Sequence, residues 1–451
     1  MLTTLVGDDV TVPCLDGVER TYLCLDAGAS TPAFQTVADA VTGFLPWYSS
    51  VHRGAGAKSQ FATRRYEEAR DAVMRWVGRS DTDDIAVLCR NTTEAINIAA
   101  HRIPLGPNDT IVTTVVEHHA NLLPWQRAAT RSGATISYVE CGRDGTFSPD
   151  DVAAAVNATV AEGRRPAVVA ITGAANVTGW MPDLDPIIDH AHQHGALVLV
   201  DAAQLAPHRP LHTLRADFIA WSGHKMYAPF GSGVLIGPRR VFEHGDPFLV
   251  GGGAVNLVDL DGAMWTEAPD REEAGSPNVV GAVALHAAID TFETLRWEAI
   301  VEHELAMAKA LRHGLAGIDG VTLLGPSVDH SSTASDTLAV AAFTIDAMAH
   351  PLVAARLSHE YGIGVRHGCF CAHPYLVRLL GLSGDETRRY RHDITVGDRR
   401  NIPGAVRASV AISATGADIE RFLSAVDDLA GGKPEPRPYV QDPTTGDYLP
   451  G

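Results

Sequence analysis

A lysine that follows an apolar run is the first residue in the sequence to suggest chemistry. Lys225 ends the sequence Ser-Gly-His-Lys, after the mostly apolar residues 217–221 and before a glycine-rich segment. Burial lowers the pKa of a lysine because it disfavours the ammonium form, and the neutral amine can then condense with an aldehyde. An isolated lysine in a loop is more often an ordinary surface residue, so this interpretation depends on other segments.

An acidic residue stands 24 positions upstream, at the end of another apolar run. Asp201 ends the sequence Val-Leu-Val-Asp, and a carboxylate buried there needs a cationic partner. The protonated pyridine nitrogen of pyridoxal 5′-phosphate (PLP) is such a cation, and the pairing strengthens the ring as an electron sink. Gln204 follows and could hydrogen-bond the 3-oxygen of the ring. The alternative for Asp201 is an ordinary helix cap.

Two further segments place polar residues at the expected ends of strands. Thr92 and Thr93 begin the sequence Thr-Thr-Glu, where the start of a helix would direct free backbone N–H groups toward a phosphate. Plain capping is the alternative for these threonines. His118 lies in Glu-His-His-Ala-Asn, where an imidazole could stack on a cofactor ring or move protons. Adjacent histidines rarely converge on one ion, so no metal site is predicted there.

The elements that must position these residues can be read from the hydrophobic pattern. Seven short runs, rich in valine and isoleucine and mostly without alternation, lie at 85–89, 110–116, 134–140, 167–172, 196–201, 217–222 and 233–237. This pattern is typical of strands buried on both faces of a sheet that helices cover. We therefore predict an α/β large domain with a mostly parallel, seven-stranded sheet.

The remaining chain is expected to form an arm, a second domain and a tail. The predicted units are an N-terminal arm at 1–24 that packs with the small domain, a large domain at 25–285, a smaller α+β domain at 286–430 and an extended tail at 431–451. A long helical region at about 279–316 leads into the small domain, which has strands near 337–345 and 406–412. The polar, charged region 383–404 is predicted to be a loop.

Composition excludes several classes of protein. The formal net charge of −18 repels nucleic acid and anionic membranes, so a phosphate-bearing ligand needs a local set of donors. No apolar run approaches the roughly 18 residues of a membrane-spanning helix, and the first residues lack a basic, apolar signal. The six cysteines are few and scattered, unlike a secreted disulfide framework, and Cys369 and Cys371 are too closely spaced for a zinc pair. A cytoplasmic protein without a metal site is expected.

Taken in order, these motifs resemble a known family. Thr-Thr-Glu, Glu-His-His-Ala-Asn, Val-Asp-Ala-Ala-Gln, Ser-Gly-His-Lys and Glu-Ala-Gly-Ser-Pro-Asn follow one another as in class V aminotransferases. The likeness covers about residues 20–430 and is closest to cysteine desulfurases of the SufS-like group and the related selenocysteine lyases. It implies a fold-type I PLP-dependent transferase that acts on a small amino acid.

The resemblance implies which residues hold the cofactor. Lys225 would form the Schiff base and move protons at the substrate α-carbon, Asp201 would pair with the pyridine nitrogen and Gln204 with the 3-oxygen. His118 would stack on the ring. The phosphate would be held by Thr92, Thr93, Ser222 and His224. Ser276 matches a residue that reaches the neighbouring subunit's phosphate, which implies a homodimer with active sites at the interface.

The resemblance also implies how a substrate is bound and converted. Asn176 and Arg407 match groups that bind the substrate carboxylate, and Arg366 and His52 map near the mouth of the site. Cys371 aligns with the nucleophilic cysteine that takes sulfur from L-cysteine as a persulfide and leaves L-alanine. A sulfur-acceptor protein would then be a partner.

Three features depart from the family pattern and leave the reaction open. The connection 376–405 is longer than usual, Cys369 is an additional thiol, and His-Gly-Cys-Phe stands where the family has Thr-Gly-His-His. The alternatives are therefore a C–S lyase, selenocysteine lyase, epimerase or aminotransferase-like enzyme for another amino acid. A non-catalytic scaffold with the same fold is disfavoured, because Lys225, Asp201 and His118 are all present.

Overall fold

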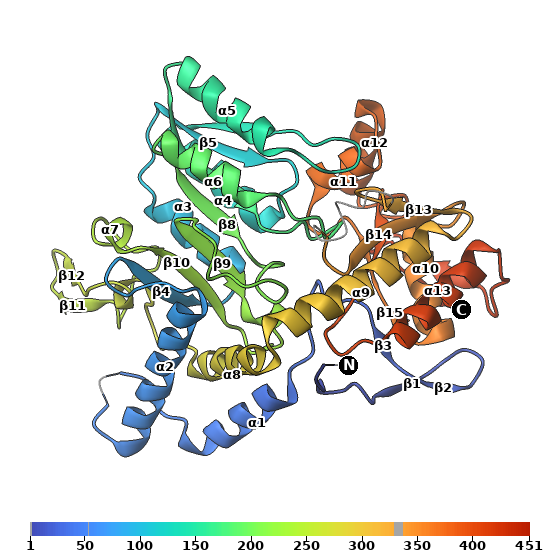
Figure 1. Ribbon diagram of the computed structural model, residues 1–451, viewed down its shortest axis with the longest axis horizontal. Helices are drawn as coiled ribbons and strands as arrows, with labels where there is room; N and C mark the ends of the chain where they lie inside the picture. The colour runs from blue at the N-terminus through green and yellow to red at the C-terminus, as the bar shows by residue number, and fades with distance from the viewer. Residues whose placement is uncertain (1, 53, 329–336) are drawn as a thin grey trace.

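The largest feature of the structure is a seven-stranded sheet (Figure 1). The computed structural model describes residues 2–52, 54–328 and 337–451. The strands are β4 (Asp84–Cys89), β5 (Asp109–Thr114), β6 (Thr135–Val139), β7 (Arg165–Thr172), β8 (Leu197–Asp201), β9 (Phe218–Ser222) and β10 (Gly233–Pro238). Their order is β4–β10–β9–β8–β7–β5–β6, and only β10 runs antiparallel to its neighbours. All seven predicted strands and their mostly parallel arrangement are confirmed.

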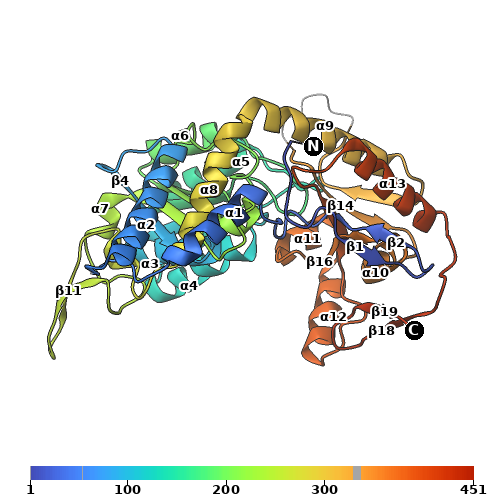
Figure 2. The same ribbon diagram turned by 90° about the horizontal axis from the view of Figure 1, so that it is seen from below.

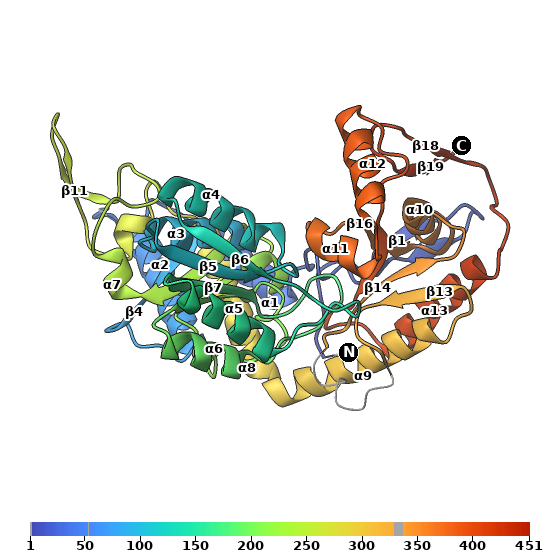
Figure 3. The ribbon, with the colours of Figure 1, turned by 90° about the horizontal axis from the view of Figure 1, so that it is seen from above.

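Helices cover both faces of this sheet, which explains the apolar runs (Figure 3). Successive residues of β7 point to opposite faces, so Val168 joins one buried cluster and Val169 joins another. One face packs on α3 (Thr92–Arg102) and α4 (Leu123–Ser132). The other packs on α1 (Gln35–Phe44), α2 (Ala57–Trp76), α5 (Pro149–Ala161), α6 (Leu184–Gln193) and α8 (Val279–Leu295). A short helix, α7 (Arg239–Phe242), follows β10.

A second, smaller body is built around a four-stranded sheet. Its strands are β13 (Val321–Leu324), β14 (Val340–Ile345), β17 (Ala405–Ser409) and β16 (Arg366–Gly368), in that order, and its helices are α9 (Trp297–Ala316), α10 (His350–Tyr361) and α13 (Gly416–Ala430). The predicted long helical region is α8 followed by α9, separated at Arg296, whose φ is 63°. The strands expected near 337–345 and 406–412 are β14 and β17.

The N-terminal segment packs on the smaller body. Its strand β3 (Leu23–Cys24) pairs in parallel with β15 (Ile363–Gly364), and β1 (Thr11–Pro13) and β2 (Glu19–Thr21) form a hairpin. The predicted domain boundaries at residues 24, 285 and 430 remain predictions. Within the described ranges, no helix is both long enough and apolar enough to cross a membrane.

The prediction of a loop at 383–404 is wrong. This region contains helix α12 (Gly384–Thr395), which follows α11 (His373–Leu379) and projects from the smaller body (Figure 3). Ser383 and Glu386 form a capping box at its start. The helix has no buried residue, so the sequence lacks the apolar stripe by which helices are usually recognised.

The C-terminal tail contains a hairpin that is attached to the region after α12. Strands β18 (Tyr439–Gln441) and β19 (Tyr448–Pro450) pair antiparallel. The Arg399 N–H donates to the Pro443 carbonyl at 2.9 Å, and the Gln441 amide donates to the Arg400 carbonyl at 3.0 Å. The tail and the region after α12 therefore support each other.

A glycine fixes how closely β10 approaches the start of α3. A Cβ atom at Gly233 would lie 2.5 Å from the Asn91 Cα and 2.6 Å from the Asn91 nitrogen. Because this neighbour is backbone, we expect Gly233→Ala to lower the free energy of unfolding by about 1–3 kcal/mol, measured by urea denaturation. The control is Gly43→Ala in α1, where a Cβ would meet nothing within 4 Å. Equal stability of the two variants would contradict a packing role for Gly233.

Candidate active site

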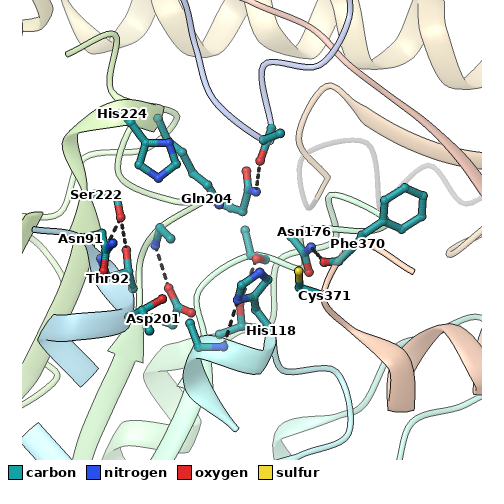
Figure 4. Close-up of a pocket in the computed structure, with 18 of the residues that line it drawn as sticks. Asn91, Thr92, His118, Asn176, Asp201, Gln204, Ser222, His224, Phe370 and Cys371 are labelled. Atoms are coloured by element: carbon teal, nitrogen blue, oxygen red, sulfur yellow. Dashed lines mark hydrogen bonds between the residues drawn. The ribbon is translucent and has the colours of Figure 1, made fainter. Parts of the chain in front are cut away.

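Residues predicted from separate segments meet in one pocket between the two bodies. The pocket has a volume of about 260 Å³ and lies beyond the carboxyl ends of β8 and β9 (Figure 4). Twelve of the predicted residues line it: Thr92, Thr93, His118, Asn176, Asp201, Gln204, Ser222, His224, Lys225, Arg366, Cys371 and Arg407. The carboxyl ends of parallel strands converge on one edge of a sheet, which is where ligands bind in such folds.

Two predicted residues lie outside this pocket. His52 and Ser276 line a second cavity together with Gly252 and Gly253. His52 also pairs with Glu67 at 2.9 Å. A single chain therefore does not bring these two residues to Lys225.

One end of the pocket has the donors of an anion site. The side chain of Asn91 caps α3 by accepting a hydrogen bond from the Glu94 N–H at 3.0 Å. The Ser222 hydroxyl, at the end of β9, accepts from the Thr92 N–H at 2.8 Å and lies 2.7 Å from the Thr92 hydroxyl. Hydroxyl groups thus gather at the positive end of a helix, where a phosphate is favoured.

Lys225 stands at the other end of the turn that follows β9. Burial lowers the pKa of its amine to about 8, although the Asp201 carboxylate acts in the opposite direction. Asp201 ends β8, is buried, and accepts a hydrogen bond from the Ala203 N–H at 3.0 Å. Burial raises the pKa of Asp201, and the charge of Lys225 opposes that shift. The neutral, nucleophilic form of the Lys225 amine is therefore far more populated near neutral pH than that of an ordinary lysine.

The histidine predicted to stack on a cofactor ring is held as a neutral base. His118 Nδ1 accepts a hydrogen bond from the Ala120 N–H at 3.0 Å, so its proton lies on Nε2. Burial and the nearby Lys225 lower the pKa of His118 to about 3. The same two causes lower the pKa of His224 to about 4. Neither imidazole adds positive charge to the pocket at neutral pH.

A buried carboxyl below the pocket was missed as a functional candidate. Glu117 accepts hydrogen bonds from the Thr114 hydroxyl at 2.8 Å, the Thr172 N–H at 3.1 Å and the Asn121 amide at 2.6 Å. It thereby fixes the segment that carries His118. Burial, with the Asp201 charge as a smaller cause, raises the pKa of Glu117 to about 8. The only signal in the sequence is an acidic residue after an apolar run.

Asp26 was also missed, and it joins the two arginines of the pocket. Arg407 donates to the Asp26 carboxylate at 3.2 Å and to the Asn176 carbonyl at 2.9 Å. Arg366 pairs with the other Asp26 oxygen at 3.0 Å. Among the described residues, Arg407 Nε and Asn176 Oδ1 are buried without a hydrogen-bond partner. Both atoms belong to side chains that line the pocket.

The cysteine predicted to be nucleophilic lies on the rim contributed by the smaller body. Cys371 is exposed, and it lines the pocket together with His118 and Asn176 (Figure 4). The preceding residue, Phe370, accepts a hydrogen bond from the Asn176 amide at 2.8 Å. The thiol and the Lys225 amine therefore face one volume, although they come from different bodies.

Together, the sheet and the site define a fold-type I transferase. The chain matches the sequence model of the class-V aminotransferase family over residues 23–422. It belongs to that family, as the motifs predicted.

Several relatives carry the name cysteine desulfurase. A probable cysteine desulfurase of Halalkalibacterium halodurans is 37% identical over 358 residues, which is 78% of this chain and 84% of the relative. A probable cysteine desulfurase of Halobacterium salinarum is 33% identical and aligns with 91% of this chain and 92% of its own length.

Solved structures of that name have the same fold. The apo cysteine desulfurase from Thermococcus onnurineus NA1 superposes with a TM-score of 0.78 at 32% identity, covering 91% of this chain and 95% of its own. The Escherichia coli cysteine desulfurase CsdA gives a TM-score of 0.75 at 32% identity, covering 91% of this chain and 94% of its own.

The low pKa of Lys225 should make it the most reactive of the four lysines. In protein freed of bound carbonyl compounds, we expect cyanate at pH 8 to carbamylate Lys225 before Lys58, Lys309 or Lys433, as followed by peptide mass spectrometry. Lys433 is the internal control, since its bond to Asp428 raises its pKa. Asp201→Asn should further lower the pKa of Lys225 and accelerate its modification at pH 7. A Lys225 that reacts no faster than Lys433 would contradict this electrostatic description.

Proposed function

We propose that this protein is a PLP-dependent cysteine desulfurase, which converts L-cysteine to L-alanine and retains the sulfur as a persulfide on Cys371. The observation that carries the proposal is that Lys225 and Cys371 line the same pocket, beside a buried arginine with an unpartnered nitrogen. The names of the relatives and of the solved structures support the same reaction.

The residues of the pocket fit PLP. The Thr92 and Ser222 hydroxyls at the start of α3 suit the phosphate, the Asp201 carboxylate suits the pyridine nitrogen, and the Lys225 amine suits the aldehyde. The ring would lie beside His118, whose neutral imidazole can stack on it without repelling a cation. PLP, when bound, withdraws electrons from the α-carbon of the substrate.

The other side of the pocket suits the substrate. Arg407 Nε is unpartnered, and a guanidinium can grip a carboxylate through two nitrogens. Asn176 is held in place because its amide bonds Phe370. The neutral Lys225 amine can take the α-proton and return it, since its pKa is about 8. The Cys371 thiolate is then the group that accepts the substrate's sulfur, while the carbon skeleton leaves as alanine.

The exposed apolar surface supports a homodimer. A hairpin of β11 (Val255–Val258) and β12 (Ala263–Trp265) extends from the large body (Figure 2). Leu257, Val258, Leu260 and Met264 on it are more than half exposed. A second copy of the chain would cover this surface, and the nearby Ser276 would reach the phosphate site of that copy.

The absence of disulfides among the six cysteines supports a reducing compartment. All six cysteines are free, as in proteins of the cytoplasm. A sulfur-acceptor protein is the expected partner, because Cys371 is exposed at the rim and a persulfide there is accessible.

The proposal predicts the products and the residues required to form them. Purified protein should show visible absorbance from bound PLP that Lys225→Ala abolishes. With L-cysteine and a reductant it should yield alanine and sulfide in equal amounts. Cys371→Ala should reduce alanine formation by about 100-fold or more while the visible absorbance persists.

The matched control is Cys141→Ala, which removes a cysteine outside the pocket. It should retain full activity. Formation of pyruvate and ammonia in place of alanine would assign a lyase reaction, and the absence of bound PLP would leave only a scaffold role.

Arg407 should control substrate binding separately from cofactor binding. Its side chain is 3% exposed, so Arg407→Gln loses a buried, charge-assisted bond to the substrate carboxylate. We expect kcat/KM for L-cysteine to fall by about 100-fold, mainly through KM, while bound PLP remains detectable by its visible absorbance. Arg366→Gln is the comparison, because that side chain is 50% exposed and should contribute about tenfold or less. Equal losses in the two variants would contradict this assignment.

A further inference from the structure

Two thiols lie on one tight turn at the rim of the pocket. Cys369 and Cys371 are the first and third residues of a turn that the Ala372 N–H closes by donating to the Cys369 carbonyl at 2.9 Å. We propose that Cys369 resolves the persulfide on Cys371, so that the enzyme releases sulfide and forms a Cys369–Cys371 disulfide. The inference rests on the proposed desulfurase function, which supplies the persulfide.

The backbone of the turn brings the two cysteines close. Both central residues, Phe370 and Cys371, have φ values of 54°, in the left-handed region used by type I′ turns. Successive Cα atoms are ~3.8 Å apart, so in a chain bent this sharply the first and third residues fall within the ~4.4–6.8 Å that a disulfide spans. The Cys371 N–H is also within electrostatic reach of the Cys369 thiol.

Contacts on three sides hold this conformation. The Asn176 amide donates to the Phe370 carbonyl at 2.8 Å, and the His119 N–H donates to the Cys371 carbonyl at 2.8 Å. The Arg407 guanidinium lies over the Phe370 ring at 5.2 Å from its centroid. Left-handed backbone is unfavourable for a non-glycine residue, and it persists only where the surroundings enforce it. The backbone that carries both cysteines is therefore held by the pocket itself.

The two thiols have different surroundings, which suit different roles. Cys371 is exposed and lines the pocket, so it can receive sulfur from a substrate. Cys369 is half-buried against the core and lies within electrostatic reach of Tyr390 on α12 and of Arg399. Burial and the neighbouring Cys371 raise the pKa of the Cys369 thiol. Cys369 is thus shielded from substrate but adjacent to the persulfide once it forms.

The proposed step balances without an added oxidant. The Cys369 thiol gives up its proton and attacks the Cys371 Sγ, the bond between that atom and the terminal sulfur breaks, and the terminal sulfur takes up the proton and leaves as hydrogen sulfide. The two thiols together lose two electrons, and the terminal sulfur gains them. A dithiol reductant must then reduce the disulfide before the next turnover.

A single turnover without reductant tests this step. One equivalent of L-cysteine is added to the holoenzyme, alanine and sulfide are measured, and the peptide with both cysteines is analysed by non-reducing mass spectrometry. We expect equal alanine and sulfide, and a peptide two hydrogens lighter than the dithiol. Cys369→Ser should form the same alanine, release at least ~10-fold less sulfide and retain one additional sulfur atom on Cys371.

The control and a second measurement separate this inference from the proposed function. Cys141→Ser should behave as the unsubstituted protein does. In a redox buffer of oxidised and reduced dithiothreitol, without substrate, the Cys369–Cys371 disulfide should form reversibly. A stable persulfide on Cys371 of the unsubstituted enzyme, or no disulfide in oxidising buffer, overturns the inference. A disulfide without alanine formation would overturn only the proposed reaction.

Discussion

The buried guanidinium of Arg407 is the interaction on which the rest of the pocket depends. From β17 it reaches Asp26 in the N-terminal segment and the Asn176 carbonyl after β7, and it lies over the Phe370 ring. A buried arginine is costly unless it is paired, so these three segments must close around it. Its charge also adds to burial in lowering the pKa of Lys225. The charge of Arg407 therefore constrains both how these segments pack and the pKa of Lys225.

The large sheet and most of the pocket could be predicted because each has a local signal. Strands covered on both faces need continuous apolar runs, such as those at 167–172 and 196–201. A polar residue at the end of such a run, such as Asp201 or Ser222, is conspicuous in the sequence. Since parallel strands end at one edge of the sheet, residues recognised separately must lie together. The position of Lys225 beside Asp201 follows from that geometry.

Other features have no local signal. Helix α12 buries none of its residues, so only its Ser383 cap could have revealed it. Asp26 gains its importance from Arg407, which lies 381 positions away in the sequence. The left-handed turn at Phe370 and Cys371 contains no glycine at its centre, and contacts with distant segments enforce it. Each depends on contacts between segments that periodicity and spacing do not encode.

The same turn has a mechanical consequence. Phe370 and Cys371 are held in a left-handed conformation that neither prefers, so the loop stores backbone strain. The hydrogen bonds from the Asn176 amide and the His119 N–H hold the loop in this strained conformation. Loss of either contact would let the backbone relax and carry the Cys371 sulfur away from Lys225. These two hydrogen bonds hold the Cys371 thiol at the pocket. They therefore also set the energy required to move that thiol out of the pocket toward another protein.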